Sequence, residues 1–292
     1  MAIALRLHAR RDPRLTMLDR VESQSSRSQD DAATPATASW ARSSHRLETA
    51  WARHLDDVRE AQRLRYRVFA LEMGARLVVP PGTPPGLDVD RFDDFCEHVL
   101  VRAVPLSDGV PEVVGTYRVL TPSAARRAGG YYSETEFDLQ QLAGMRPRMA
   151  ELGRSCIHPA WRTGGAILAL WGALGEFLSS RRLEVAFGCA SVDLRDGGHR
   201  AASLWRRLSE RHCASEPWRV SPLKPLPLAS LRDDLDVATP PLIKGYLRCG
   251  AELLGLPAWD TAFQTADLPM LLTLDALPQP HRRRFLGAGS GH

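Results

Sequence analysis

Two charged residues, Glu151 and Arg154, stand three positions apart in a segment whose other residues are small or apolar. A carboxylate can accept a proton from a nucleophile and a guanidinium can bind an anionic group, so the pair has the chemistry of an active site. A structural ion pair is the alternative, and the spacing alone does not decide between them. Residues three apart on a strand point to opposite faces unless a bulge intervenes, so we expect one of the two to face a cleft while the other supports the sheet.

The segment that follows has the pattern of a strand, a tight loop and a helix. An apolar run ends at Ile157, a loop with a proline, an arginine and paired glycines comes next, and apolar residues then recur at helical spacing from Ile167 to Leu178. Such a junction directs backbone N–H groups and the positive end of a helix dipole to one point, where proteins bind phosphate groups. The alternative is a turn with a purely structural role.

The remaining polar residues suggest no metal site and no serine hydrolase. An acidic loop with Asp88, Asp90, Asp93 and Asp94 could bind a cation or form a solvated face, and it lacks the ligand spacing of an EF-hand. Five cysteines stand singly without a CxxC pair, so neither a zinc site nor a disulfide framework is expected. There is no nucleophile elbow and no Ser-His-Asp order.

The composition is that of a globular protein with a mildly basic surface. Of the 292 residues 44% are apolar, enough to bury a core, and the formal net charge is +4 at pH 7. Lys224 and Lys244 are the only lysines, so arginine supplies most of the positive charge. The longest nearly uncharged apolar stretch, Ala166 to Leu178, is shorter than the roughly 20 residues that cross a bilayer. We expect a cytoplasmic protein with at most peripheral contact with the inner membrane, and no nucleic-acid partner because the basic residues do not cluster in one run.

Hydrophobic periodicity predicts an alternating series of helices and strands. We expect helices near 47–73, 165–180, 199–212 and 240–250, and strands near 98–104, 112–120, 149–157, 184–190, 259–263 and 270–274. This order predicts an α/β fold with a mixed central sheet flanked by helices. The Ser- and Ala-rich start predicts a disordered N-terminal tail over residues 1–45, followed by one domain over 46–285 and a flexible C-terminal tail over 286–292.

The order of several motifs resembles that of a known enzyme family. A helix segment from Arg65 to Phe69, the acidic loop, Gly115-Thr-Tyr-Arg118 and then Glu151-Leu-Gly-Arg154 resemble the acyl-homoserine-lactone synthases. These enzymes are a branch of the Gcn5-related N-acyltransferase (GNAT) fold, so the resemblance implies that fold.

Further motifs are more similar to another branch, the L-ornithine N-alpha-acyltransferases. They are the extended motif from Glu151 to Arg162, Phe187-Gly-Cys-Ala-Ser191, and the late segments Pro240–Ala251 and Trp259–Phe263, and the resemblance covers about residues 50 to 285. It implies that a 3-hydroxy fatty acyl group moves from acyl carrier protein to the alpha-amine of L-ornithine, which forms lyso-ornithine lipid. No cofactor is implied apart from the phosphopantetheine arm that carries the donor.

This chemistry gives particular residues expected roles. An amine must lose a proton to attack a thioester, so we expect Glu151 to take that proton, directly or through water, with Arg154 as its catalytic partner. Resemblance to the lactone synthases places the substrate cleft beside Arg65, Phe69, Asp90, Asp93 and Arg118. As alternatives, Asp90 or Asp93 could pair with the substrate's amines, and Arg118 or Arg154 could bind its carboxylate. We expect the phosphopantetheine arm to lie against the loop that contains Ile157, Arg162, Gly164 and Gly165.

One departure from the related pattern bears on the acyl donor. Acetyl-coenzyme-A users of this fold show Gln/Arg-x-x-Gly-x-Gly/Ala, whereas here Ile167 occupies the last position. A shorter phosphate loop suits the single phosphate of a phosphopantetheine arm on acyl carrier protein. That protein is acidic, so its expected docking residues are Arg162, Arg181 and Arg182. The alternatives are acylation of another amino acid, acyl-homoserine-lactone synthesis, or a non-catalytic relative that binds acyl carrier protein.

Overall fold

A computed structural model describes residues 44–162 and 165–286 of the chain. Its α-helices are α2 (Leu55–Tyr66), α3 (Pro122–Ala128), α4 (Ala166–Ser180), α5 (His199–His212), α6 (Pro241–Arg248) and α7 (Gln279–Leu286). Its longer strands are β1 (His45–Trp51), β2 (Glu97–Pro105), β3 (Glu112–Leu120), β5 (Met149–Ile157), β6 (Val185–Asp193) and β10 (Thr265–Thr273). Its short strands are β4 (Phe137–Asp138), β7 (Ser221–Pro222), β8 (Glu252–Leu253) and β9 (Ala258–Asp260).

The main sheet is mixed, as the sequence predicts. Its strand order is β1-β2-β3-β5-β6-β10-β8, and β9 also pairs with β10. The pairing of β5 with β6 is parallel, and the other named pairings in this sheet are antiparallel. A parallel pair needs a crossover connection, and α4 supplies it between β5 and β6.

Helices cover both faces of this sheet because its strands alternate apolar side chains between the two faces. On one face, α2 packs on Leu100 and Cys156, and α3 packs on Leu120 and Met149. On the opposite face α4 packs on Val119 and Ala150, and α5 packs on Ala190 and Val192. Val119 and Ala150 are adjacent in sequence to Leu120 and Met149, so neighbouring residues do point to opposite faces. A site at the centre of the sheet is therefore formed by residues of β3, β5 and β6.

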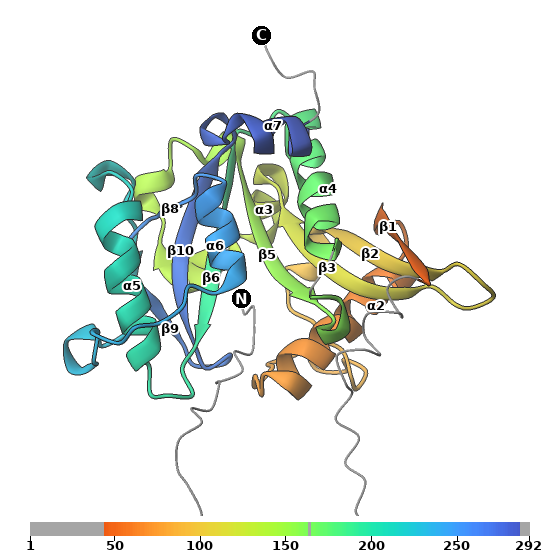
Figure 1. The fold of residues 1–292 in the computed structure, drawn as a ribbon, viewed down its shortest axis with the longest axis horizontal. Coiled ribbons are helices and arrows are strands. Elements are labelled where there is room, and N and C mark those ends of the chain that lie inside the picture. Colours follow the sequence, from red (N-terminus) through yellow and green to blue (C-terminus); the bar gives the residue numbers. More distant parts are fainter. Residues whose placement is uncertain (1–43, 163–164, 287–292) are drawn as a thin grey trace, which may run out of the picture.

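Strands β5 and β6 pair only at their starts and then separate (Figure 1). The parallel register covers residues 149–151 against 185–187, although β5 continues to Ile157 and β6 to Asp193. At the point of separation Gly188 lies so close to β5 that a Cβ atom there would come within 2.3 Å of the Leu152 carbonyl oxygen. The sheet thus opens in its middle, beyond Glu151.

A bulge in β5 lies beside this opening. Between the pairs Thr116–Cys156 and Arg118–Gly153, β5 has one more residue than β3, and Arg154 adopts a positive φ of 50°. A bulge changes the face on which the following side chains emerge. The strict alternation expected between Glu151 and Arg154 is therefore broken.

Most predicted elements are confirmed, and the start of the domain is where the prediction is wrong. Helical periodicity was expected from near Leu47, but residues 45–51 form strand β1 at the edge of the sheet and the helix begins at Leu55. Helix α3 was not predicted, although Thr121 caps it, Pro122 begins it and Gly129 ends it with a φ of 82°. The predicted tails, apart from the residues next to β1 and the end of α7, lie outside the described residues. Within the described part of the chain no helix has the length and apolar character needed to cross a membrane.

We expect Gly188→Ala to reduce the free energy of unfolding by about 1–3 kcal/mol, because the added methyl group would collide with the β5 backbone. Gly172→Ala in α4 is the matched control: a methyl group there meets nothing within 4 Å, and alanine favours a helix interior by about 0.5–1 kcal/mol. Urea unfolding of both variants measures the difference. Equal stability of the Gly188 variant and the unaltered protein would contradict this close contact.

Candidate functional site

A buried ion network begins at Arg65 on α2. The Arg65 Nε donates to Asp88 at 2.8 Å, and its two terminal nitrogens donate to Asp93 at 2.8 and 2.7 Å. Burial alone would raise the pKa of Asp93, but the charges of Arg65 and Arg118 hold that pKa well below its ordinary value. Burial, and then the Arg65 charge, lower the pKa of His98, which packs against Asp93, to about 4. Ion pairs from Arg65 to Asp88 and Asp93 therefore hold the acidic loop against α2.

The network continues through two further arginines. Arg118 on β3 donates to Asp90 at 2.7 Å and to Asp93 at 2.9 Å, and Arg154 on β5 donates to Asp90 at 3.0 Å. Arg154 also has its Nε 3.7 Å from Asp88. Three guanidinium groups thus face three carboxylates in a buried cluster. These charges can be buried away from water because each has a neighbour of opposite charge.

Arg154 is the member of the network with spare hydrogen-bonding capacity. It is 5% exposed, yet its Nε and Nη1 have no hydrogen-bond partner among the described residues. Its guanidinium lies over the ring of Phe263 at 4.5 Å and faces the ring of Tyr132 at 5.2 Å. Buried N–H groups are normally paired, so this side chain can bind an anionic group that enters the site.

Glu151 accepts three hydrogen bonds from one short turn. Its Oε2 accepts from the backbone N–H of Tyr132 at 2.6 Å, and its Oε1 accepts from the backbone N–H of Ser133 at 2.8 Å and from the Ser133 hydroxyl. The Ser133 hydroxyl is in turn 3.5 Å from the Cys189 sulfur. Burial raises the pKa of Glu151, and the hydrogen bonds from Ser133 and Tyr132 limit that rise.

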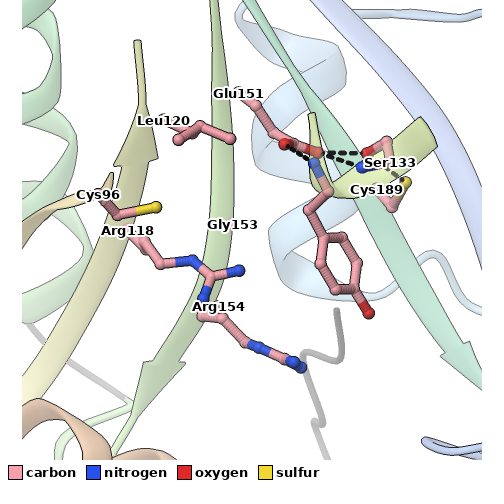
Figure 2. Close-up of a pocket in the computed structure, with 9 residues that line it drawn as sticks. Cys96, Arg118, Leu120, Ser133, Glu151, Gly153, Arg154 and Cys189 are labelled. Atoms are coloured by element: carbon pink, nitrogen blue, oxygen red, sulfur yellow. Dashed lines mark hydrogen bonds between the residues drawn. The ribbon is translucent and has the colours of Figure 1, made fainter. Parts of the chain in front are cut away.

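These groups meet in one cavity at the opening of the sheet. Figure 2 shows the Glu151–Ser133 hydrogen bonds on one side of the space and Arg118 and Arg154 on the other. The cavity is open to solvent, with about 340 Å³ of space that includes part of that solvent, and it is lined by Cys96, Arg118, Leu120, Tyr132, Ser133, Glu151, Gly153, Arg154 and Cys189. The expectation that Glu151 and Arg154 face opposite sides of the sheet is wrong, because the β5 bulge brings both to this cavity.

An apolar groove lies on the other face of the same strands. Two adjoining hollows of about 390 and 500 Å³ share Tyr117, Leu152, Ala186, Tyr246 and Leu272, and neither is lined by a charged side chain. The Tyr117 and Tyr246 hydroxyls hydrogen-bond to each other where the hollows meet. Leu152 follows Glu151 directly in β5, so the polar cavity and the apolar groove are separated by little more than one strand.

The predicted phosphate loop lies away from the ion network, at the start of α4. Arg162 holds Glu72 through two nitrogens at 2.6 Å each, and its Nε donates to the carbonyl of Ile157 at 3.1 Å. Gly165 is the N-cap residue of α4, without a side-chain cap, and Gly164 lies outside the described residues. The roles expected for this loop stay predictions.

The three arginines expected to dock a protein partner do not form one patch. Arg162 precedes α4, whereas Arg181 and Arg182 follow its last residue. The helix between them has 15 residues, which is about 22 Å of length. Arg181 lies beside Glu97 at 3.7 Å on the exposed surface at that far end.

The structure brings most of the predicted residues together and adds others that the sequence did not reveal. The cavity and its ion network contain Arg65, Asp90, Asp93, Arg118, Glu151 and Arg154. Phe69 does not touch Arg154 directly: its ring contacts that of Phe263, with centroids 5.7 Å apart, and the Phe263 ring in turn contacts the Arg154 guanidinium. Unforeseen members are Tyr132, Ser133 and Cys189, and Asp88 of the acidic loop also joins the network by accepting from Arg65. The only sequence signal for Tyr132 and Ser133 was that they lie in a polar Tyr-Tyr-Ser-Glu interval before β5.

Among the described residues one group has donor atoms close enough to hold a metal ion. Donor atoms of Glu136, Cys189 and Asp267 lie within 4.8 Å of one another beside the cavity. Burial and the neighbouring charges of Glu136 and Asp267 raise the pKa of Cys189 well above its ordinary value. A metal would need the thiolate, so this environment is a poor match for one.

Comparison with known proteins agrees with this arrangement. Residues 64–172 match the model of a family described as acetyltransferase (GNAT) domain. An L-ornithine N(alpha)-acyltransferase of Brucella abortus (strain 2308) is 35% identical over 246 residues, which cover 79% of this chain and 85% of the relative. The chain belongs to the L-ornithine N(alpha)-acyltransferase family. A second family member, from Rhodobacter capsulatus, is 35% identical over 264 residues, which cover 83% of this chain and 97% of the relative.

The family and the GNAT fold expected from the sequence are therefore confirmed, and the protein is an acyltransferase of this family. Solved structures that align with it include the AHL synthase LasI, with a TM-score of 0.46 and 13% identity over 83% of this chain and 95% of that chain. A second is the CoA-dependent acyl-homoserine lactone synthase BjaI, with a TM-score of 0.46 and 17% identity over 84% of this chain and 91% of that chain.

We expect the buried His98 to make the protein less stable in mild acid. Its pKa of about 4 in the folded state lies below the ordinary 6.5, so the unfolded chain takes up a proton that the folded chain does not. This contribution is complete above pH 6.5 and is lost as the pH falls toward 4, by about 2 kcal/mol at pH 5. Urea unfolding at pH 5 and 7 should show a smaller loss in His98→Gln, whose amide can still donate to Asp93, and equal losses would contradict the assignment.

Proposed function

We propose that the protein transfers a 3-hydroxy fatty acyl group from acyl carrier protein to the alpha-amine of L-ornithine. The observation that carries the proposal is the opening between β5 and β6, which has a charged cavity on one face and an apolar groove on the other. A reaction that joins a charged amino acid to a fatty chain needs both environments at one point. The relatives' names, L-ornithine N(alpha)-acyltransferase, support ornithine as the acceptor.

The acceptor amino acid would occupy the charged cavity. Its carboxylate would bind the free N–H groups of Arg154, whose hydrogen bond to Asp90 fixes the guanidinium in place. Asp90 and Asp93 are already committed to the arginines of the network, so of the alternatives considered from sequence, binding of the carboxylate by Arg154 is the better supported.

Proton removal from the amine is assigned to Glu151. Both of its oxygens receive hydrogen bonds from the turn, and the Ser133 hydroxyl stands between Glu151 and Cys189, so the proton would pass to Glu151 through that hydroxyl or through a water molecule. The neutral amine then attacks the thioester carbonyl, and the leaving thiolate of the donor takes up a proton. Backbone N–H groups of β5 beyond Glu151, its last residue paired with β6, would stabilise the oxyanion.

The acyl chain would occupy the apolar groove. The groove runs from Leu152 and Gly188, at the opening of the sheet, to Leu277 and Phe285 under α7, and it carries no charged group. Transfer of apolar surface from water into such a groove is worth about 25 cal/mol per Å². Binding of a long chain there would hold its thioester end beside Glu151.

The phosphopantetheine arm of the donor would enter along the loop from Ile157 to Gly165. The first N–H groups of α4 have no side-chain cap there, and Arg162 braces the loop through Ile157 and Glu72. Ile167 packs against the apolar cluster under α4, which agrees with a structural rather than a phosphate-binding role for this residue.

A direct assay tests the proposal. The purified protein is incubated with 3-hydroxyacyl thioesters of acyl carrier protein or coenzyme A and a panel of amino acids, and products are identified by mass spectrometry. We expect acylation of ornithine at its alpha-amine, with faster turnover of the acyl carrier protein thioester. A clear preference for coenzyme A would overturn the donor assignment, and acylation of another amino acid in preference to ornithine would overturn the acceptor.

We expect Glu151→Gln to lower kcat by about 100- to 10,000-fold, because the amide cannot accept the amine proton. The unaltered enzyme should lose activity as Glu151 is protonated, with a midpoint above that of an ordinary glutamate because burial raises its pKa. This acidic limb of the kcat profile should be missing in the variant. Since Glu151 also holds the Tyr132–Thr135 turn, thermal unfolding must show that the variant folds. A folded variant that keeps most of its kcat would exclude the role of base.

A further inference from the structure

The apolar groove contains a pair of hydroxyl groups that the reaction described above does not use. Among the described residues that line its two hollows, Tyr117 on β3 and Tyr246 on α6 are the only ones with a side-chain oxygen, and their hydroxyls hydrogen-bond to each other. Both rings are held by their surroundings, since Tyr117 is 2% exposed and Tyr246 stacks on Trp171 with ring centroids 5.6 Å apart. The tyrosine pair is therefore a fixed polar point in a groove that is otherwise lined by apolar side chains.

The tyrosine pair borders the part of the groove that adjoins the charged cavity. Cys189 lines both that cavity and the nearer hollow, and Tyr117 and Tyr246 line the same hollow. The two tyrosines also line the second hollow, which extends to Phe285 on α7. An acyl chain whose thioester end lies beside Glu151 would therefore pass the tyrosine pair early along its length, before its methyl end reaches α7.

The tyrosine pair can hydrogen-bond to a further hydroxyl. Burial raises the pKa of Tyr117 to about 12, and burial together with Tyr117 raises the pKa of Tyr246 well above its ordinary value, so both phenols keep their protons at neutral pH. Their mutual hydrogen bond uses one O–H group and one lone pair, and the Ser155 hydroxyl, which lowers the pKa of Tyr117 by hydrogen bonding, uses at most one more position. Lone pairs on the phenol oxygens therefore remain to accept from a ligand. A hydroxyl buried in this groove needs such a partner, because burial without a hydrogen bond is unfavourable.

We propose that the hydroxyls of Tyr117 and Tyr246 bind the 3-hydroxyl of the acyl group, so that this pair selects a hydroxylated chain over an unsubstituted one. The inference rests on the proposed function for the presence of an acyl chain in the groove, but it depends on neither the acceptor nor the carrier protein. The third carbon is two bonds from the thioester carbonyl carbon, so its hydroxyl lies toward the cavity, as the tyrosine pair does. Because a fixed pair meets the chain from one direction, we expect it to favour one enantiomer.

The alternative is that the tyrosine pair only ties α6 to β3. A purely structural contact of this kind would give the protein equal affinity for hydroxylated and unsubstituted chains of one length. The ratio of the two affinities therefore separates the alternatives. Replacement of both tyrosines by phenylalanine is a suitable change, because removing both partners of a buried hydrogen bond while keeping their shape costs little stability.

The test uses N-acetylcysteamine thioesters of decanoic acid and of each enantiomer of 3-hydroxydecanoic acid. They are titrated without an acceptor, and binding is followed by tryptophan fluorescence because Trp171 lines the groove. We expect the unaltered protein to bind one 3-hydroxy enantiomer about 3- to 10-fold more tightly than the decanoyl thioester, as one neutral hydrogen bond allows. The double variant Tyr117→Phe/Tyr246→Phe should lower this ratio to about one or less. Tyr66→Phe is the matched control and should keep the ratio, because the half-buried Tyr66 lies on α2, which packs on the other face of the sheet.

Two outcomes would overturn the inference. They are equal affinity of the unaltered protein for the hydroxylated and unsubstituted thioesters, which needs no variant, and an undiminished preference in a double variant that thermal unfolding shows to be folded. The titration also separates this inference from the proposed function. A preference for the hydroxylated thioester that depends on the two tyrosines, without acylation of ornithine, would refute the function alone. Acylation of ornithine from donors that bind with equal affinity would refute the inference alone.

Discussion

The buried pairing of three arginines with three aspartates is the interaction on which the rest of the site depends. It joins α2, the acidic loop, β3 and β5 through Arg65, Arg118 and Arg154. Removing one member of such a cluster leaves a buried charge without a partner, which costs about 3–5 kcal/mol. The network also decides which charges are available for a ligand, because the aspartates are used internally and Arg154 keeps two buried donors without a partner among the described residues.

The second constraint is the separation of β5 from β6. Parallel pairing that stops after Glu151 leaves an opening through the sheet, with the charged cavity on one face and the apolar groove on the other. The bulge at Arg154 is what allows Glu151 and Arg154 to share one face. In the proposed function, a charged substrate and a fatty chain would approach the same strand from opposite sides of the sheet.

Three buried acids around the cavity show how the surroundings assign different tasks to one chemical group. Asp93 is held ionised by two arginines, and Glu151 is buried among hydrogen-bond donors. Glu136 is buried next to another carboxylate with no donor from the described residues. The first has a structural role, the second is suited to exchange a proton, and burial favours the uncharged form of the third. Such a division is invisible in the sequence, where all three are simply acidic residues.

The sequence by itself determined the longer helices and the central strands, because their apolar residues recur with a clear period over many positions, as in α4 and α5. It also supplied the motifs that identify the family and most of the charged residues of the site. It did not determine β1, since an edge strand that is largely exposed carries little apolar alternation. Nor did it show that Glu151 and Arg154 share a cavity, which depends on one extra residue in the β3–β5 register. The meeting of Glu136 with Asp267 was decided only by the tertiary structure, because contacts between residues so far apart in the chain arise from strand pairing and packing and leave no local pattern.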